Sequence, residues 1–488
     1  MQARPPGDAS PHAGRQKRWR PWVLAGVYLL GAVHWLHWKY AGTTLAPAEL
    51  NEAQYTLEHS IVTVGFILLA AAMLATIVFG RFFCGWGCHV LAMQDSAAWL
   101  LRRVGFTPKP VRLRLAQLLP LFAMGTMFLW PQIERAMDAG HEPAPPLRVT
   151  ADSEGFGSLV TADFSRNLPG PWMSITTFVV CAGVATWLLG TRSFCTYVCP
   201  YGAIFSLADR ASPTRVRLKV LNGGHGDASA DCSNCGLCTA ACPSHIRVHE
   251  ELMDFGRVVN PACLRDYHCV AACPDAKLDI GAARPAGFLS WRKWGRFGVP
   301  YDLSWREELV AASVGVCSLL ILRGLYDAVP FFLAMALAVI LSYAAVVTMR
   351  VGGRRAVSFA GWTMSRDGAM THAGRVFSVA AVVACAALLQ SAAVRAHSWL
   401  GMEAFEQAAD SPAECARAQW HLEWVEEWSV VHTDAVDRRL ALLAIDRGDA
   451  AGARPRVERI IARGVSPQEA ESWRDSLVAN PRSTPGYR

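Results

Sequence analysis

The sequence predicts a mainly α, polytopic helical membrane protein with a cytoplasmic, cysteine-rich α+β insert and a C-terminal soluble helical domain. Hydrophobic residues make up 52% of the 488 residues and charged residues only 18%, against about 25% charged in an ordinary soluble domain. The apolar residues lie in long blocks, as membrane spans do. The 15 cysteines are spaced unevenly, many in tight groups, which is typical of metal ligands. A plain soluble enzyme and a small disulfide scaffold are therefore excluded.

Seven apolar stretches are long enough to cross a hydrocarbon core of about 30 Å, which takes roughly 20 helical residues. They lie at residues 22–40, 61–80, 115–130, 172–190, 309–325, 329–349 and 376–394. The third stretch is short and contains Pro120. We therefore expect about seven spans.

The distribution of Lys and Arg predicts the orientation of these spans, because basic flanks favour the cytoplasm. Basic residues gather before the first span, after the second and after the sixth, whereas the loop 41–60 has three glutamates and no Lys or Arg. Seven alternating spans fit every flank. Residues 193–306 then lie in the cytoplasm and the tail from 396 lies outside a bacterial inner membrane. The net charge of +7 belongs to the cytoplasmic flanks, so no nucleic-acid partner is expected.

This topology divides the chain into five parts. They are a cytoplasmic tail (1–20), a four-span membrane core (21–210), the cytoplasmic insert (211–306), three further spans (307–395) and an extracytoplasmic helical tail (396–488). Amphipathic runs at 413–430, 436–445 and 453–461 predict the helices of the tail. These form either hairpins similar to tetratricopeptide repeats or a plain helical cap.

The insert contains the bacterial ferredoxin run, in which three closely spaced cysteines bind one iron–sulfur cluster and a fourth, before Pro, binds its neighbour. The first run is Cys232, Cys235, Cys238 and Cys242, followed by Pro243. A zinc site is the alternative for thiolates at such spacing. The pattern before Pro favours a ferredoxin-like domain with [4Fe–4S] clusters.

A second run, Cys263, Cys269 and Cys273 before Pro274, has Asp266 where the second cysteine would stand. The crossed arrangement assigns Cys232, Cys235, Cys238 and Cys273 to one [4Fe–4S] cluster. Cys263, Asp266, Cys269 and Cys242 remain for the other. Either Asp266 supplies a carboxylate oxygen to the fourth iron, or that iron is labile and leaves a [3Fe–4S] cluster. Loss of the second cluster is the remaining alternative.

A repeated motif lies at the cytoplasmic ends of the second and fourth predicted spans. Both copies read R-x-F-C-x3-C: the first contains Cys84 and Cys88, and the second Cys195 and Cys199. Cysteines at i and i+4 share one helix face if the helix continues. Two such pairs at equal membrane depth would present four thiolates, which suit a third iron–sulfur cluster or copper. Redox-active disulfides and purely structural cysteines are the alternatives.

These motifs resemble those of the membrane-bound polyferredoxins of the NosR and NapH type, and more distantly the oxidase assembly factor CcoG. The resemblance covers residues 22 to about 349 and rests on FCGWGCHVLAMQD, FCTYVCPYGAIFSLADR and the double ferredoxin run. His89 departs from the proline usual after the second cysteine, and Asp266 from a ferredoxin cysteine. The resemblance implies electron transfer between quinol or a cytoplasmic donor and a respiratory reductase or a maturation system.

Three histidines near the outer surface form a separate candidate site. His34 and His37 share one face of the first span, and His59 precedes the second span at the same depth. Together they could ligate a b-type haem or bind quinol. The alternative is that they belong to an interfacial aromatic belt.

We therefore expect a membrane electron-transfer subunit rather than a stand-alone enzyme. The sequence contains no nucleophile–base pair, phosphate loop or metallohydrolase motif, and so no catalytic residue is predicted. The expected partners are the lipid bilayer, quinol or a cytoplasmic donor, and a partner oxidoreductase or client protein docked by the C-terminal helices. The alternative functions are a copper-reducing, metal-handling assembly factor and a redox sensor.

Overall fold

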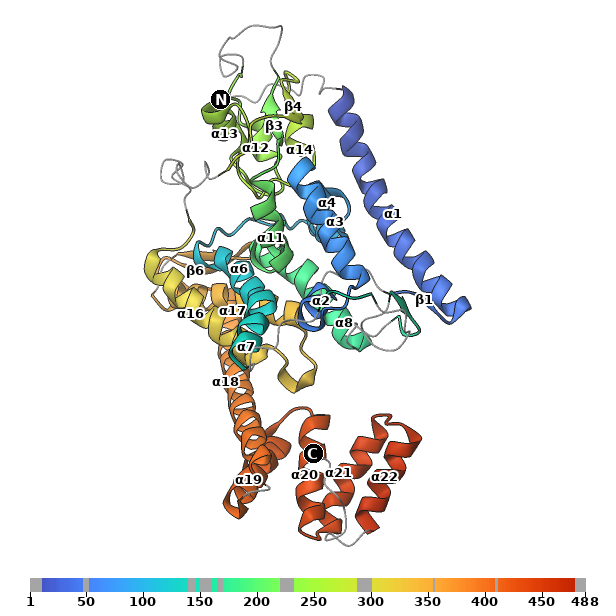
Figure 1. The fold of residues 1–488 in the computed structure, drawn as a ribbon. Helices are drawn as coiled ribbons and strands as arrows, with labels where there is room; N and C mark the ends of the chain where they lie inside the picture. The colour runs from blue at the N-terminus through green and yellow to red at the C-terminus, as the bar shows by residue number, and fades with distance from the viewer. Residues whose placement is uncertain are drawn as a thin grey trace. The chain divides into compact units, whose positions relative to one another are not determined.

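The computed structural model describes residues 11–46, 52–138, 146–149, 159–164, 170–219, 232–287, 301–353, 356–408 and 411–478 (Figure 1). The described chain is mostly helical with short strands, as the predicted fold class requires. It divides into two compact units. Unit 1 comprises Met1–Gly315, Met335–Val347 and Val357–Thr363, and unit 2 comprises Val316–Ala334, Thr348–Ala356 and Met364–Arg488.

The described part of the first half of unit 1 is mostly helical. Its elements are α1 (Pro11–Ala41), β1 (Thr44–Leu45), α2 (Glu52–His59), α3 (Val64–Phe79), α4 (Phe82–Trp86), α5 (His89–Arg103), η1 (Leu115–Leu118), α6 (Leu119–Met124), η2 (Gly125–Leu129), α7 (Trp130–Asp138), β2 (Val160–Thr161), α8 (Pro171–Phe178), η3 (Val179–Val184), α9 (Ala185–Leu189), α10 (Ser193–Tyr197) and α11 (Pro200–Asp209). The strands β1 and β2 pair antiparallel, with Thr44 opposite Thr161.

Glycines end two of the predicted spans. Thr63 caps the start of α3 by accepting the Phe66 amide, and Gly80 ends the helix with φ 72°. Gly190 ends α9 with φ 97°. A β-carbon at Gly190 would lie 2.6 Å from the Cα of Pro110. Positive φ and close backbone approach both favour glycine, and each glycine turns the chain into one copy of the repeated cysteine motif.

Three described helical stretches are long and apolar enough to cross a membrane: Pro171–Leu189, Phe331–Gly352 and His372–Glu406. Val64–Phe79 is apolar but shorter. These four correspond to the predicted fourth, sixth, seventh and second spans. The stretches predicted at 22–40, 115–130 and 309–325 are helical as well, but do not reach the same length and hydropathy. A membrane protein is thus supported, and the count of seven spans stays a prediction.

The insert of unit 1 is a small α+β body, drawn in green at the N label of Figure 1. It consists of β3 (Thr214–Leu218), α12 (Leu237–Ala240), α13 (Val248–Phe255), α14 (His268–Ala271) and β4 (Leu278–Ala282). The strands pair antiparallel from Thr214 opposite Ala282 to Leu218 opposite Leu278. Buried aliphatic residues of both strands and of α13 form its core together with several of the cysteines.

Unit 2 contains most of the C-terminal tail. Its elements are η4 (Leu325–Asp327), β7 (Ala369–Met370), α18 (His372–Glu406), α19 (Pro412–Trp428), α20 (Asp434–Asp446), α21 (Ala450–Ala462) and α22 (Pro467–Val478), while α16 (Trp305–Leu322), α17 (Phe331–Gly352) and β6 (Trp362–Arg366) contribute residues to both units and β5 (Val357–Phe359) belongs to unit 1. The helices α19, α20 and α21 lie on the three amphipathic runs of the tail. Leu422, Val425 and Leu440 are buried between them and α18.

Candidate iron–sulfur centres

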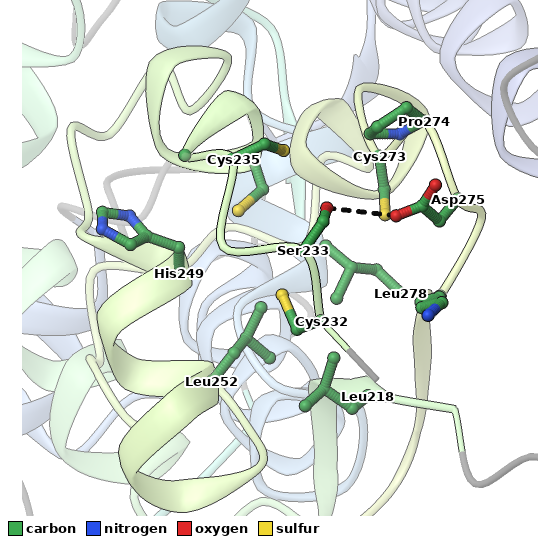
Figure 2. Close-up of a pocket in the computed structure, with 13 residues that line it drawn as sticks. Leu218, Cys232, Ser233, Cys235, His249, Leu252, Cys273, Pro274, Asp275 and Leu278 are labelled. Atoms are coloured by element: carbon green, nitrogen blue, oxygen red, sulfur yellow. Dashed lines mark hydrogen bonds between the residues drawn. The ribbon is translucent and has the colours of Figure 1, made fainter. Parts of the chain in front are cut away.

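The first predicted set of cluster ligands surrounds one pocket of the insert. Cys232, Cys235, Cys238 and Cys273 all line it, and Figure 2 shows Cys232, Cys235 and Cys273 arranged around the same space. Three of these cysteines come from the first run and the fourth comes from the second, so the fold brings together the crossed set. Leucines of β3, α13 and β4 line the same pocket. Soft thiolates in an apolar shell fit an iron–sulfur cluster.

The two cysteine runs share one backbone pattern. Asn234 and Gly236 in the first run have φ of 49° and 72°. Arg265 and Tyr267, at the same offsets in the second run, have φ of 54° and 62°. Left-handed conformations at matching positions are rare outside glycine. The equivalence therefore places Asp266 where the first run has Cys235.

The second predicted set lies deeper than the first. Cys263 and Cys269 are buried, whereas Cys235 of the first set is exposed. Burial, with added contributions from the neighbouring Asp266 and Cys263, raises the pKa of the Cys242 thiol to about 12. Burial also raises the pKa of Cys269, with added contributions from Cys263, Asp266 and Cys242. The four donors are thus close neighbours, and such buried thiols would lose their protons readily only to a bound metal.

Among the described residues, no three His, Cys, Asp or Glu side chains converge tightly enough to hold a single metal ion. An iron–sulfur cluster does not require this, because each thiolate binds a different iron.

Asp266 belongs to an ion-pair network as well as to the second set. Its carboxylate lies 3.2 Å from Nδ1 of His268 and 3.5 Å from Nη2 of Arg192. Arg192 also pairs with Asp95 at 3.0 Å, and Asp95 pairs with Arg20 at 2.7 Å. Burial alone would raise the pKa of Asp266, but His268 and Arg192 lower it to about 2. Asp266 is therefore a carboxylate, the form in which it could ligate iron.

The repeated motif forms two similar helix breaks. The helix does not continue through either motif: α4 and α10 end after Trp86 and Tyr197, and Cys88 and Cys199 cap the next helices, α5 and α11. The Cys199 sulfur accepts the Gly202 amide at 3.3 Å. A thiolate at a helix N-terminus is stabilised by the helix dipole. The break thus orients the second cysteine of each pair.

The four edge cysteines lie next to one another. Burial, with added contributions from Cys88 and Cys84 of the other copy, raises the pKa of Cys199 to about 12. Burial also raises the pKa of Cys195, with Cys88 as the largest added influence. We call Cys84, Cys88, Cys195 and Cys199 the edge group. Its donors are four thiols, two from each repeat.

Each motif arginine contacts the helix that follows the other copy. The amide of Arg81 donates to Asp209 at 3.2 Å, and the guanidinium of Arg192 pairs with Asp95. Both arginines are buried. Four thiolates on an oxidised four-iron cluster carry a net charge of about minus two, and the cluster potential depends on nearby charge. Two buried cations beside the edge group therefore suit an anionic cluster.

The edge group packs directly against the loop of the second set. A β-carbon at Gly85 would lie 2.2 Å from the carbonyl oxygen of Leu264, so only glycine permits this approach. The indole of Trp86 donates to the Arg265 carbonyl at 3.1 Å. Arg265 in turn pairs with Asp209 at 2.7 Å. The loop Cys263–Asp266 is thus fixed to the membrane-edge motif from both sides.

The three histidines that the sequence predicts near the outer surface each contact a neighbouring residue. His34 hydrogen-bonds with the Leu45 carbonyl at 3.0 Å, and His37 with the Thr44 hydroxyl at 3.0 Å. The ring of His59 packs against Tyr55, 4.4 Å between centroids. His34 and His37 thus bind the strand β1, and the haem or quinol site predicted there stays a prediction.

Four residues that the site depends on were not singled out as site residues from the sequence. Arg81 and Arg192 stand at the same place in the repeated motif, and this repetition was the available signal. Asp95 and Asp209 close the two quoted segments. Their cross-pairing has no sequence signal, because each partner lies in the other copy of the motif.

Three family descriptions match the segments that carry these groups. Residues 61–107 match a 4Fe-4S binding domain, and residues 191–247 and 226–274 match two 4Fe-4S dicluster domains. The first contains Cys84 and Cys88, and the last contains all seven cysteines of the insert. The chain therefore carries 4Fe-4S domains of the ferredoxin type.

Curated relatives have the same character. The ferredoxin-type protein NapH of Haemophilus influenzae is 24% identical over 272 residues, covering 52% of this chain and 79% of NapH. The methylamine utilization ferredoxin-type protein MauN of Methylorubrum extorquens is 26% identical over 193 residues, 39% of this chain and 58% of MauN. MauN of Paracoccus denitrificans is 27% identical over 187 residues, 37% of this chain and 53% of its own length. The chain thus spans less than two thirds of either MauN. No solved structure matches. The predicted resemblance to NapH-type proteins is confirmed.

Glu251 makes the loop before Cys263 sensitive to pH. Its carboxylate accepts the amides of Val259 and Asn260 at 2.7 and 3.0 Å. Burial raises its pKa from 4.5 to about 7. The folded state thus favours the protonated carboxyl group of Glu251. The contribution of this group to the free energy of unfolding is full below pH 4.5. It falls, by at most about 3 kcal/mol, as the pH rises to about 7.

We expect Glu251→Gln to remove this dependence. Hydrogen exchange of residues 256–262 should be compared between wild type and variant at each pH, which cancels the intrinsic effect of pH on exchange. Wild-type protection should fall relative to Glu251→Gln between pH 4.5 and 7. The matched control is Glu250→Gln on the same helix, whose carboxylate is only partly buried. Equal pH profiles for wild type and Glu251→Gln would contradict the assignment.

Proposed function

We propose that the protein relays electrons through iron–sulfur clusters at the cytoplasmic edge of a bacterial inner membrane. The donor is quinol or a cytoplasmic reductant, and the acceptor is a partner oxidoreductase or a maturation system. One observation carries this proposal: three groups of cluster-type donors follow one another within unit 1. Cys238 of the first set raises the pKa of Cys269 of the second, and Leu264, in the loop of the second set, lies against Gly85, in the motif that contains Cys84 and Cys88.

The exposure of the three groups supports an order for them along the relay. Cys235 of the first set is exposed and would bring its cluster close to a soluble partner. Cys263 and Cys269 are buried and would hold an internal relay. The edge group lies where two apolar helical stretches end, and would exchange electrons with a membrane-bound partner. Each set thus has a distinct place in the relay.

The edge group is proposed to hold a third cluster. Its four thiols, the helix-capping positions of Cys88 and Cys199, and the buried cations of Arg81 and Arg192 support this assignment. Positive charge beside a cluster stabilises its reduced form and raises its potential. The extracytoplasmic helices α19 to α22 would then serve to dock a partner or client protein.

Metal analysis and EPR of anaerobically purified wild type and Asp266→Cys test the relay and its unusual centre together. A relay requires at least about eight irons, with matching labile sulfide, per chain. Apart from the cluster of the edge group, wild type should show one ordinary four-cysteine centre and a second centre with altered spin state or a [3Fe–4S] signal. Asp266→Cys supplies a soft fourth ligand, so its second centre should become an ordinary [4Fe–4S] centre.

Asp266→Asn is the matched control, because it keeps the shape of the side chain without a thiolate. Apart from the cluster of the edge group, it should not produce a second ordinary centre. Two all-cysteine centres within the insert of wild type would contradict the role of Asp266. Stoichiometric copper with little iron would instead support the metal-handling function.

A further inference from the structure

A cavity of about 400 Å³ in unit 1 lies between the predicted membrane core and the insert. Thr191 and Ser206 line it from the core, and His245 and Asn260 line it from the insert. A volume of about 300–1,000 Å³ is typical of small-molecule sites. Of the eleven cysteines assigned to clusters, only Cys195 lines it, so the cavity is separate from the space that the clusters would fill.

The charged side chains in the wall of this cavity are mostly cations. One carboxylic acid, Glu251, lines it together with five arginines: Arg81, Arg112, Arg192, Arg210 and Arg247. Glu251 already accepts the amides of Val259 and Asn260, and it offsets at most one of the five positive charges. The wall of the cavity therefore favours an anionic ligand.

Arg112 is the cation of this wall that is most available to a ligand. Its backbone amide donates to the Asp302 carboxylate at 2.6 Å, which fixes the chain at this position. Its guanidinium makes no hydrogen bond or ion pair with another residue that the structure describes. By contrast, Arg192 pairs with Asp95 and Asp266. A half-buried guanidinium without a partner is costly unless a ligand supplies the opposite charge.

Two further observations show donors and positive charge directed at the same space. The Nε atoms of Arg81 and Arg192 are buried and have no hydrogen-bond partner within the described chain. Burial lowers the pKa of His245 to about 4, with added contributions from Arg112 and Arg192. His245, Arg112 and Arg192 all line the cavity, so their charges and donors converge on one ligand position.

The cavity also has an apolar side with exposed leucines. Leu118, Leu121 and Leu207 line it and are 54%, 39% and 47% exposed. The first two begin the predicted third span, and Leu207 lies on α11, which packs against α6. Exposed leucines at the end of a span face the lipid hydrocarbon rather than water. An acyl chain could therefore reach the cavity from the bilayer.

We propose that this cavity binds the phosphate of an acidic phospholipid, with Arg112 as its main charged contact and the acyl chains leaving past Leu118, Leu121 and Leu207. A guanidinium can bind two phosphate oxygens at once. Basic pockets between spans on the cytoplasmic side suit acidic headgroups. A soluble phosphate has the same chemistry but would leave the apolar side unused. Because core and insert both line the cavity, the bound lipid would fasten the insert to the membrane, independently of the relay.

Native mass spectrometry of the delipidated full-length protein in a non-ionic detergent tests the site with dioleoylphosphatidylglycerol and dioleoylphosphatidylcholine. Wild type should bind phosphatidylglycerol at least about tenfold more tightly, because only this lipid carries a net negative charge. Arg112→Gln should weaken phosphatidylglycerol binding by at least about tenfold. Leu121→Trp adds bulk at the apolar side, keeps every cation and should also weaken phosphatidylglycerol binding.

Arg103→Gln is the matched control, because it removes an exposed charge from the same basic flank and Arg103 does not line the cavity. It should leave phosphatidylglycerol binding within about twofold. Equal losses in Arg112→Gln and Arg103→Gln would reveal only general attraction to a basic flank and would overturn the site. Unchanged binding in Arg112→Gln and Leu121→Trp would overturn it as well.

Inorganic phosphate distinguishes the two sources of the anion. If it binds wild type as tightly as phosphatidylglycerol does, and Leu121→Trp leaves both unchanged, the lipid is overturned in favour of a soluble phosphate. Iron analysis separates the site from the relay, since Arg112→Gln should keep the iron and labile sulfide of wild type. Phosphatidylglycerol binding that depends on Arg112, in a protein without clusters, would support the lipid site and sink the relay.

Discussion

Replacement of Cys84 or Cys195 by Ser should remove about four irons per chain, the content of one four-iron cluster. The edge group has one cysteine pair from each repeat. Cys84 and Cys88 raise the pKa of Cys199, and Cys88 and Cys199 raise the pKa of Cys195. A hydroxyl is a poor ligand for iron compared with a thiolate. Loss of either pair member should therefore empty the same site. The measurement is chemical iron and labile sulfide of anaerobically purified protein.

The two centres of the insert should survive in both variants, and their EPR signals provide the internal reference. Cys317→Ser is the matched control, because Cys317 is exposed on α16 and belongs to no ligand group. It should keep the full iron content. If the edge group binds copper instead, copper content should fall in Cys84→Ser and Cys195→Ser while iron stays constant. Unchanged iron and copper in both variants would sink both forms of the shared site.

Gly85→Ala should separate the edge group from the second cluster set. The added β-carbon would lie 2.2 Å from the Leu264 carbonyl oxygen, and this oxygen belongs to the backbone of the loop that contains Cys263. Neither side can move by rotating a side chain, since Gly85 is buried and its carbonyl accepts the Arg20 guanidinium at 2.8 Å. Overpacking of this kind costs about 3 kcal/mol or more. We expect a lower Tm and loss of the second-set EPR signal.

Gly87→Ala is the matched control in the same motif. Its β-carbon would lie 3.2 Å from the ring of Phe83, and a side chain can yield where a backbone carbonyl cannot. It should lower Tm much less than Gly85→Ala and keep both insert centres. Equal losses in the two variants would show that the motif itself is intolerant of substitution, and that the contact with Leu264 is not the cause.

The cluster ligands were predictable because their chemistry is local in sequence. Three cysteines separated by two residues wrap one cluster, and a following Pro redirects the fourth. The same spacing placed Asp266 opposite Cys235, and the left-handed φ of Arg265 and Tyr267 matches that of the first run. The tail helices α19 to α21 also lie on visible amphipathic periodicity. The helix α22 was not foreseen, because its apolar residues are few and irregularly spaced.

The sequence placed the two cysteines of each repeated motif on one helix face only if the helix continued, and it does not continue. The helices α4 and α10 end at Trp86 and Tyr197, and the second cysteine of each pair caps the next helix. An i, i+4 pattern reports one helix face only while the helix continues. The cysteine spacing alone does not distinguish the two geometries.

The sequence by itself determined the apolar helices, the two cysteine runs, the repeated edge motif and the resemblance to ferredoxin-type membrane proteins, since each is written in a short stretch of chain. Only the tertiary structure decided how these parts meet. Arg192 pairs with Asp95, the backbone amide of Arg81 donates to Asp209, and Gly85 approaches Leu264, although each pair is far apart in the chain. Buried charges need partners and close backbone contacts need glycine. Which partner meets which charge depends on packing between distant segments, and no local pattern encodes that.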